Sequence, residues 1–225
     1  MDWKQNTPQF KEAFDRKGYL VLRGFMSGSE AQEINRQTER YIADVLPTLP
    51  ENAAFYEVKN DPQAIMRLQN MSANDAFFEQ ISSNDRFVEL SEFLMEDQVV
   101  SKPVQWFNKP ARVGKVTPPH QDGFYVMLEP NEALTLWLAI DSADEENGCI
   151  RYVPGSHRRD MRPHRPSGVL GFSQGITDYG DDDFGAEVPI VVEPGDLIAH
   201  HCLTIHRADP NPGDRHRAAL GFHYH

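Results

Sequence analysis

The sequence predicts an α+β protein with a mostly β core, on three observations. Residues 1–98 carry apolar side chains at helical spacing, with one early strand. From about residue 99, short β-like runs alternate with Gly, Pro and Asp, a pattern typical of a double-sheet jelly roll or a barrel. The chain has 225 residues and no visible internal repeat, which fits one domain. We expect a single domain, with a mainly helical cover at 1–98 packed on one sheet of a core at 99–225.

The first part of the chain is expected to form helices around one strand. Apolar spacing predicts a helix that stops at Gly18 and is followed by a strand at 19–22. Ser29 with Gln32 three residues later has the pattern of a capping box. The helices expected from these signals are at 10–17, 29–46, 74–81 and 85–94.

The second part is expected to form short strands and one long loop. The strands are apolar runs bounded by turn residues, at 104–107, 124–127, 134–140, 150–153, 188–192, 197–201 and 218–224. The stretch 157–187 has little periodicity, begins basic and becomes acidic. A loop of this length inside a compact domain is usually a functional lid or a disordered insertion, so we expect a lid loop here.

Charge and composition exclude several classes of protein. With 22 Lys plus Arg against 34 Asp plus Glu, the net charge is −12, which argues against nucleic-acid binding and against an anionic membrane surface. No apolar run approaches the length of a membrane span, and residues 1–6 lack the features of a secretory signal. Two cysteines are too few for a disulfide framework. We expect a cytoplasmic protein, monomeric or weakly homo-oligomeric, acting on a small molecule.

Two metal-binding side chains lie in the triplet His120-Gln121-Asp122. In an extended chain, positions i and i+2 point to the same side roughly 6.6 Å apart, so both could reach one ion. Two imidazoles and one carboxylate with open positions beside them form the facial triad of non-haem Fe(II) oxygenases. A chain of this composition has about an even chance of containing a His-x-Asp triplet, so a purely structural role for these residues is as compatible with the sequence as metal binding. A third ligand must come from elsewhere in the chain.

That third ligand is sought among three histidines at or beyond the 197–201 strand. Taken singly, His200 and His201 are more often ordinary core or surface residues than ligands. His206 precedes a loop, which is where sites are usually built. An oxygenase that uses a keto acid also needs a cation for its carboxylate, and Arg binds carboxylates with two hydrogen bonds. Arg217 shares a strand face with small residues, although a lone Arg is usually a solvated charge.

Ordered motifs run through the second part of the chain: Asn108-Lys109-Pro110, His120-Gln121-Asp122-Gly123, Trp137-Leu138-Ala139-Ile140-Asp141, Glu146-Asn147-Gly148-Cys149, Pro154-Gly155-Ser156-His157, Gly195-Asp196, His206-Arg207-Ala208-Asp209-Pro210-Asn211 and Arg217. In these motifs the chain resembles the phytanoyl-CoA dioxygenase (PhyH) family of Fe(II)- and 2-oxoglutarate-dependent oxygenases. The segment 14–25 resembles the helix and strand that open the family, so the resemblance covers nearly the whole chain.

The resemblance implies a cupin-like double-stranded β-helix as the jelly-roll core. It implies Fe(II) as the metal, 2-oxoglutarate as cosubstrate, O2 as oxidant and ascorbate as an accessory reductant. It assigns the iron to His120, Asp122 and His206. The arginine for the distal carboxylate of 2-oxoglutarate corresponds to Arg217, with Arg215 as the fallback.

The resemblance also places Gln105, Thr135 and Trp137 in the cosubstrate pocket. Relatives often carry Ser two residues after the distal His, where this chain has Ala208. One hydroxyl contact to the cosubstrate is therefore missing or replaced. Related halogenases have a small residue in place of the metal-binding carboxylate, so Asp122 favours hydroxylation.

The function expected from this resemblance is hydroxylation of a C–H bond in a small anionic or zwitterionic metabolite, with release of succinate and CO2. The chain shows no strong basic field for a CoA thioester beyond 158–165, and a solvated basic loop explains that segment equally well. The alternative is a cupin-type metal-binding isomerase, or a ligand sensor without oxygenase turnover. Arg217 discriminates between them, because only the oxygenase requires a cation beside the second His.

Overall fold

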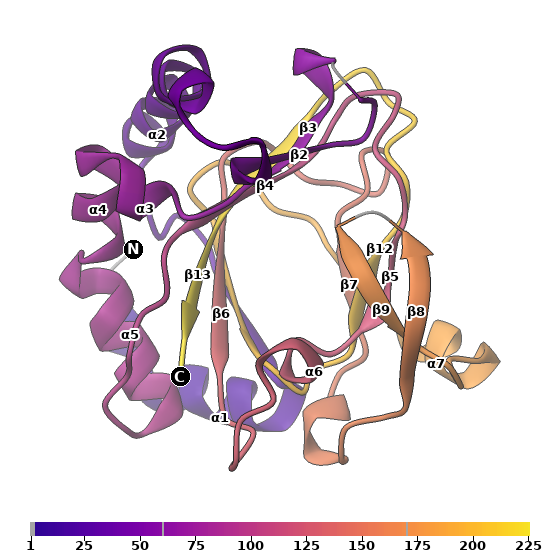
Figure 1. The fold of residues 1–225 in the computed structure, drawn as a ribbon. Coiled ribbons are helices and arrows are strands. Elements are labelled where there is room, and N and C mark those ends of the chain that lie inside the picture. Colours follow the sequence, from indigo (N-terminus) through magenta and orange to yellow (C-terminus); the bar gives the residue numbers. More distant parts are fainter. Residues whose placement is uncertain (1–2, 60, 170) are drawn as a thin grey trace.

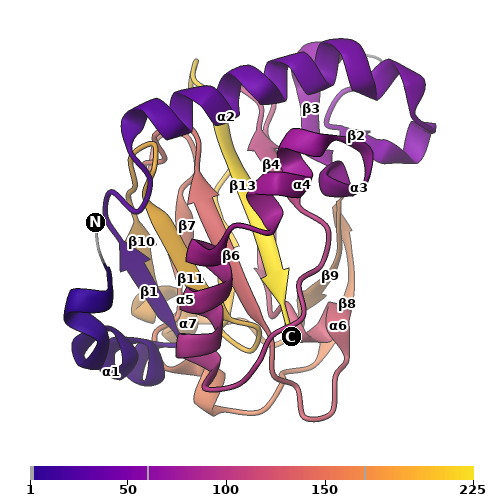
Figure 2. The same ribbon diagram turned by 90° about the vertical axis from the view of Figure 1, so that its left-hand side faces the viewer.

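The structure, a computed structural model, describes residues 3–59, 61–169 and 171–225. A seven-stranded antiparallel sheet lies between a layer of helices and a smaller, four-stranded antiparallel sheet (Figure 1). Figure 2 shows the helices in front of the large sheet. The expected α+β jelly roll, with N-terminal helices covering one sheet, is confirmed. No helix in the described part of the chain is long and apolar enough to cross a membrane.

The helices begin and end near the residues that the sequence predicts. The first helix ends at Gly18, whose φ of 80° is the left-handed conformation that glycine adopts readily. The cap of the second helix lies two residues earlier than predicted, because Ser27 rather than Ser29 accepts the capping hydrogen bond from the Glu30 amide. This α-helix ends at Arg40, short of the predicted residue 46, and the chain continues as a turn of π helix. The helices on this side are α1 (Thr7–Lys17), α2 (Gly28–Arg40), α3 (Met71–Asn74), α4 (Ala76–Ser82) and α5 (Asp85–Met95). Short turns of 3-10 or π helix lie at Trp3–Asn6, Tyr41–Val45, Leu46–Thr48, Glu51–Ala53, Pro62–Ala64 and Ser156–Arg158.

The strands form two main sheets. In spatial order, the large sheet is β1 (Tyr19–Leu22), β11 (Leu197–His201), β6 (Leu134–Ala139), β13 (Arg217–Tyr224), β4 (Gln105–Lys109), β3 (Ile65–Leu68) and β2 (Ala54–Tyr56). The small sheet is β10 (Val188–Ile190), β7 (Ile150–Tyr152), β12 (His206–Ala208) and β5 (Thr117–His120). From β4 to β7, and again from β10 to β13, successive strands lie alternately in the large and the small sheet. Residues far apart in sequence therefore meet in the space between the sheets.

Two expectations for the second part of the chain are wrong. The predicted strand at 124–127 is a single helical turn, α6 (Gly123–Val126). Asp122 already has helical dihedral angles, and this Asp-Gly turn outweighs the strand preference of the aromatic residues that follow. The stretch 157–187 is not an irregular loop. It contains the hairpin of β8 (His164–Val169) and β9 (Phe172–Ile176) and the helix α7 (Asp181–Ala186), and the hairpin lies beside β5 (Figure 1).

Candidate metal centre

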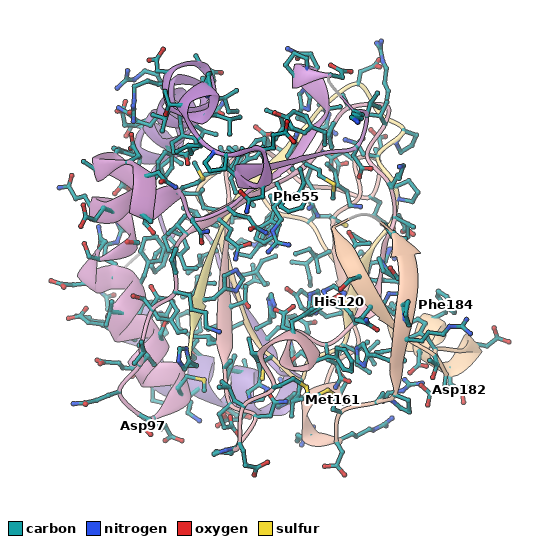
Figure 3. The ribbon with its side chains drawn as sticks, viewed as in Figure 1. Phe55, Asp97, His120, Met161, Asp182 and Phe184 are labelled. Atoms are coloured by element: carbon teal, nitrogen blue, oxygen red, sulfur yellow. The ribbon has the colours of Figure 1, made fainter. Side chains whose placement is uncertain are left out.

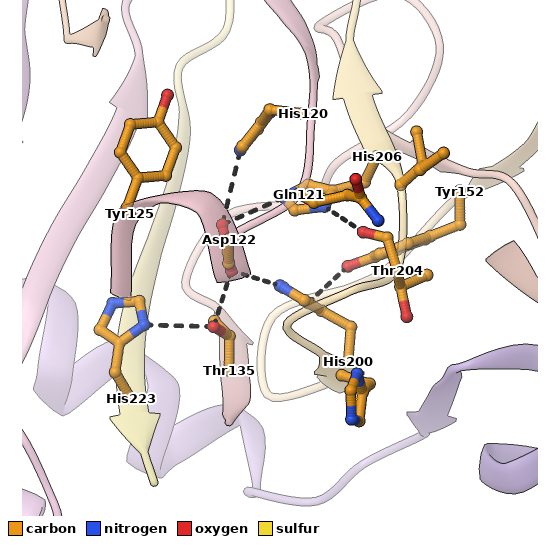
Figure 4. Close-up of polar contacts among 12 residues, drawn as sticks. His120, Gln121, Asp122, Tyr125, Thr135, Tyr152, His200, Thr204, His206 and His223 are labelled. Atoms are coloured by element: carbon orange, nitrogen blue, oxygen red, sulfur yellow. Dashed lines mark hydrogen bonds and ion pairs between the residues drawn. The ribbon is translucent and has the colours of Figure 1, made fainter. Parts of the chain in front are cut away.

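The three predicted metal ligands come together between the sheets (Figure 4). β5 ends at His120 and pairs with β12, so that His206 lies directly opposite His120. Asp122 starts the α6 turn, which directs its carboxylate back toward both imidazoles. One ligand atom from each of the three residues lies within 4.8 Å of the other two. The carboxylate Oδ1 is 3.5 Å from His120 Nε2 and 3.8 Å from His206 Nε2. Figure 3 shows His120 in the interior, unlike the labelled Asp97 and Asp182 at the surface.

The two histidines present the nitrogens that a metal requires. His120 Nδ1 lies 2.8 Å from the Pro118 carbonyl, and His206 Nδ1 lies 3.0 Å from the Thr204 carbonyl. Because a carbonyl oxygen only accepts, each Nδ1 carries the proton and each Nε2 keeps a lone pair. Burial, and then the neighbouring His120, lower the pKa of His206 to about 3. Both rings therefore suit a divalent cation.

Asp122 is held as a carboxylate with its two oxygens in different roles. Oδ1 faces the two histidines, whereas Oδ2 accepts hydrogen bonds from Thr135 Oγ1 at 2.9 Å and His200 Nε2 at 3.0 Å. Burial alone would favour the neutral acid. The neighbouring imidazoles of His120, His200 and His206, with the hydrogen bond from His200, outweigh burial, so the pKa of Asp122 lies well below its usual range. The donor set of two imidazoles and one carboxylate fits Fe(II).

Arg217 lies in the same cavity as these ligands and has no ion pair within the described ranges. Its Nη1 donates to the Gly148 carbonyl at 3.1 Å, and its guanidinium carbon is 5.2 Å from the centre of the Trp137 ring. Burial lowers the pKa of Arg217 to about 10, which still leaves it cationic at neutral pH. The fallback, Arg215, lies outside this cavity and pairs with Asp144. Arg217 is thus the residue placed to receive an anion.

The three predicted cosubstrate residues do not all line this cavity. Thr135 and Trp137 do, and Thr135 also touches Asp122. Gln105 is not among the lining residues. Its amide oxygen instead accepts from Nε and Nη2 of Arg67, and Arg67 is the residue that reaches the cavity.

The polar residues that line the cavity and were not assigned to the site from the sequence include Arg67, Lys109, His200 and His223. Lys109 lies opposite Arg217 on the neighbouring strand, and its pKa is lowered to about 7 by burial and then by Arg217. His223 Nδ1 lies 3.2 Å from Thr135 Oγ1. The signal for three of them was available, because strict alternation along β4, β11 and β13 places them on the cavity side.

Two arginines of the segment 158–165, Arg158 and Arg162, bind partners outside the cavity. Arg158 donates to the Arg16 carbonyl at 2.9 Å. Arg162 forms ion pairs with Asp178 at 3.0 Å and Asp183 at 2.8 Å. Neither lines the cavity, whose wall instead includes Gly171 at the tip of the hairpin.

A family model described as "Phytanoyl-CoA dioxygenase (PhyH)" matches residues 14–219. The peroxisomal phytanoyl-CoA dioxygenase of Rattus norvegicus is 26% identical over 228 residues, covering 95% of this chain and 67% of that protein. A probable phytanoyl-CoA dioxygenase of Caenorhabditis elegans is 28% identical, covering 94% of this chain and 72% of that protein.

Solved structures share the fold. EctD from S. alaskensis, with 2-oxoglutarate and 5-hydroxyectoine, has a TM-score of 0.78 at 21% identity, covering 96% of this chain and 74% of EctD. The epimerase SnoN, in complex with Fe3+, alpha ketoglutarate and nogalamycin RO, has a TM-score of 0.77 at 19% identity, covering 98% of this chain and 84% of SnoN. At these identities the likeness establishes the jelly-roll fold.

Proposed function

Because the chain belongs to the phytanoyl-CoA dioxygenase (PhyH) family and is therefore an oxygenase, we propose that it is an Fe(II)- and 2-oxoglutarate-dependent hydroxylase of a small anionic or zwitterionic metabolite. The reaction would release succinate and CO2 and leave a hydroxyl group on a substrate carbon. One observation carries the proposal: a buried arginine that has no ion pair among the described residues shares a cavity with two imidazoles and one carboxylate.

His120, Asp122 and His206 would hold the metal, each through one atom. When bound, Fe(II) together with 2-oxoglutarate and O2 supplies oxidising power that no side chain of the protein possesses, and ascorbate serves as accessory reductant. The protein provides two Nε2 atoms, an ionised carboxylate and a cavity that limits access of water. The carboxylate at position 122 supports hydroxylation over halogenation.

Arg217 would bind the distal carboxylate of 2-oxoglutarate, with Thr135 and Trp137 beside the bound cosubstrate. Ala208 lines the cavity where relatives often carry Ser. Lys109, the cross-strand neighbour of Arg217, lines the same cavity and would supply the donor in place of the missing hydroxyl. Its Nζ donates to the Lys115 carbonyl, which keeps the side chain along the cavity wall.

The charges of the cavity support an anionic substrate. Arg67 contacts Gln105 and lies 5.3 Å from the centre of the Phe107 ring, with no carboxylate partner among the described residues. If Arg217 takes the cosubstrate, Arg67 remains as a second cation in the same cavity. The hairpin of β8 and β9 would act as the lid, because Gly171 lies beside Met66 and both line the cavity.

The test is succinate release from 2-oxoglutarate with Fe(II) and ascorbate, comparing wild type with His120→Ala and Arg217→Ala. We expect turnover in the wild type only, stimulated by the true substrate in a screen of small carboxylates, amino acids and phosphonates. If all three proteins are equally inert while each still binds a divalent metal, the oxygenase assignment fails and the cupin-type isomerase or sensor replaces it. The cytoplasmic location, the single domain and the monomeric or weakly oligomeric state are parts of the same proposal.

A further inference from the structure

The second oxygen of Asp122 is held by two donors that face it from adjacent strands. In the large sheet, Thr135 on β6 pairs with His200 on β11. Thr135 Oγ1 and His200 Nε2 lie 2.9 Å and 3.0 Å from the same oxygen, Oδ2 (Figure 4). The sheet register therefore directs two hydrogen bonds to one oxygen and leaves Oδ1 facing the other two metal-binding residues.

A third side chain fixes the proton on His200. The Tyr152 hydroxyl lies 2.8 Å from His200 Nδ1. An ionised carboxylate only accepts hydrogen bonds, so His200 Nε2 must carry a proton, and in the neutral ring Nδ1 then accepts from the Tyr152 hydroxyl. The hydrogen bonds run in one direction, from Tyr152 through His200 to Asp122. Both nitrogens of His200 are engaged, so it is not available as a metal ligand itself.

The surroundings leave this chain of hydrogen bonds little freedom. Tyr152 is fully buried and His200 is 2% exposed, so water has little access to either nitrogen of the His200 ring. The Tyr152 ring stacks on Tyr19 at 4.6 Å between centroids, and the His200 and His206 rings are 4.7 Å apart. A contact that served stability alone would not need to end on the metal-binding carboxylate.

We propose that His200 is a positioning residue for the metal: backed by Tyr152, it holds Oδ2 of Asp122 so that the carboxylate offers only Oδ1 to the ion. A carboxylate bound through one oxygen leaves coordination positions for the keto acid and O2. This inference rests on the proposed function, since it requires the metal to lie at His120, Asp122 and His206. Removing such a hydrogen-bond partner of a metal ligand weakens metal binding by roughly 10- to 100-fold.

The test is an anaerobic titration of the full-length protein with Mn²⁺, following free Mn²⁺ by electron paramagnetic resonance. His200→Gln places an amide N–H where Nε2 lies, whereas His200→Asn places it near Nδ1. We expect His200→Asn and His200→Phe to weaken Mn²⁺ binding by roughly 10- to 100-fold and His200→Gln to stay close to wild type. Tyr152→Phe should show a smaller loss. The matched control is His201→Gln, because His201 faces away and bonds Glu132 at 2.8 Å.

Thermal unfolding of each variant verifies that it folds, and if His200→Phe does not fold, the Gln and Asn pair decides. Equal Mn²⁺ affinity in the wild type and His200→Asn, or equally weak binding in His200→Gln and His200→Asn, would overturn the inference. The visible spectrum of bound Co²⁺ gives a second readout, which should change in His200→Asn and not in His200→Gln. His120→Ala separates the two proposals: if it leaves Mn²⁺ binding unchanged, the metal centre itself is wrong.

Discussion

The two faces of the large sheet have different roles: one packs against the helices, and the other lines the cavity with the metal-binding residues. Along β13, Leu220 and Phe222 belong to the apolar core under the helices, and Phe222 stacks on Phe87 of α5 with centroids 4.1 Å apart. On the opposite face of the same strand, Arg217 and His223 line the cavity. Neighbouring residues of one strand therefore serve different purposes, one in packing against the helices and the next in lining the cavity.

The two faces also hold their side chains by different means. The helix-facing side is held by burial of apolar surface, which tolerates some repacking. The cavity side also has a smaller apolar cluster, which includes Trp137, Ile198 and Ala219. Its polar side chains are held by specific hydrogen bonds, such as those from Thr135 and His200 to Asp122, where loss of one donor leaves a buried polar group unsatisfied. Substitutions on the first face should therefore alter stability, and those on the second should alter binding and turnover.

The largest effect is expected at the metal ligands of the cavity side. His206→Ala should reduce succinate formation by at least about 10³-fold, equivalent to about 4 kcal/mol of barrier, because the metal loses one of its ligands. The free energy of unfolding of the metal-free protein should change by no more than about 1–2 kcal/mol. Steady-state turnover and denaturant unfolding measure the two quantities. Turnover near wild type would contradict the assignment of the ligand.

On the helix-facing side, Phe222→Ala should lower the free energy of unfolding by about 3–5 kcal/mol, because it leaves a cavity beside Phe87. The KM for 2-oxoglutarate of the protein that stays folded should not change. Urea unfolding and turnover at low temperature measure both. A large change in KM at unchanged stability would break the division between the two faces.

Arg217 tests the cation of the cavity side. Arg217→Met should raise the KM for 2-oxoglutarate by about 10²-fold, since truncating one partner of a buried charge pair costs about 2–5 kcal/mol. Arg215→Met is the matched control: Arg215 is near in sequence but pairs with Asp144 outside the cavity, so KM should stay near wild type. The reverse pattern would transfer the role to Arg215.

The smallest effect is expected from the protonation of Lys109. Its pKa in the folded chain is lowered from 10.5 to about 7, first by burial and then by Arg217, so its charge is lost as pH rises through about 7. The KM for 2-oxoglutarate should then rise, by less than about tenfold, and Lys109→Met should remove this dependence. Between about pH 7 and 10.5 the unfolded chain holds the proton that the folded chain has lost. Relative to Lys109→Met, the wild type should therefore gain stability with rising pH, and unfolding at several pH values measures this gain. A KM profile identical in both proteins would exclude Lys109 from the site.

The sequence was sufficient to predict the features that repeat along a strand. The alternation along 217–224 placed Arg217 and His223 on one face, and the turn at Gly18 ended the first helix as expected. The family motifs supplied the choice of His206 over its neighbours, which periodicity alone leaves open.

The features that were not predicted depend on contacts between distant segments. Arg67 lies on β3, a strand that was not expected, and its place in the cavity is fixed by pairing with β4. His200 looked like an ordinary core histidine because its role depends on the register of β11 with β6 and on the α6 turn that orients Asp122. Neither the register nor that turn can be read from local composition.

The most direct test of the metal centre is a crystal structure of the protein with Mn²⁺ and 2-oxoglutarate, grown without oxygen. We predict one anomalous peak bonded to His120 Nε2, Asp122 Oδ1 and His206 Nε2, with the distal carboxylate of 2-oxoglutarate on Arg217. A peak bonded to other side chains, or a 2-oxoglutarate molecule that does not reach Arg217, would contradict the account.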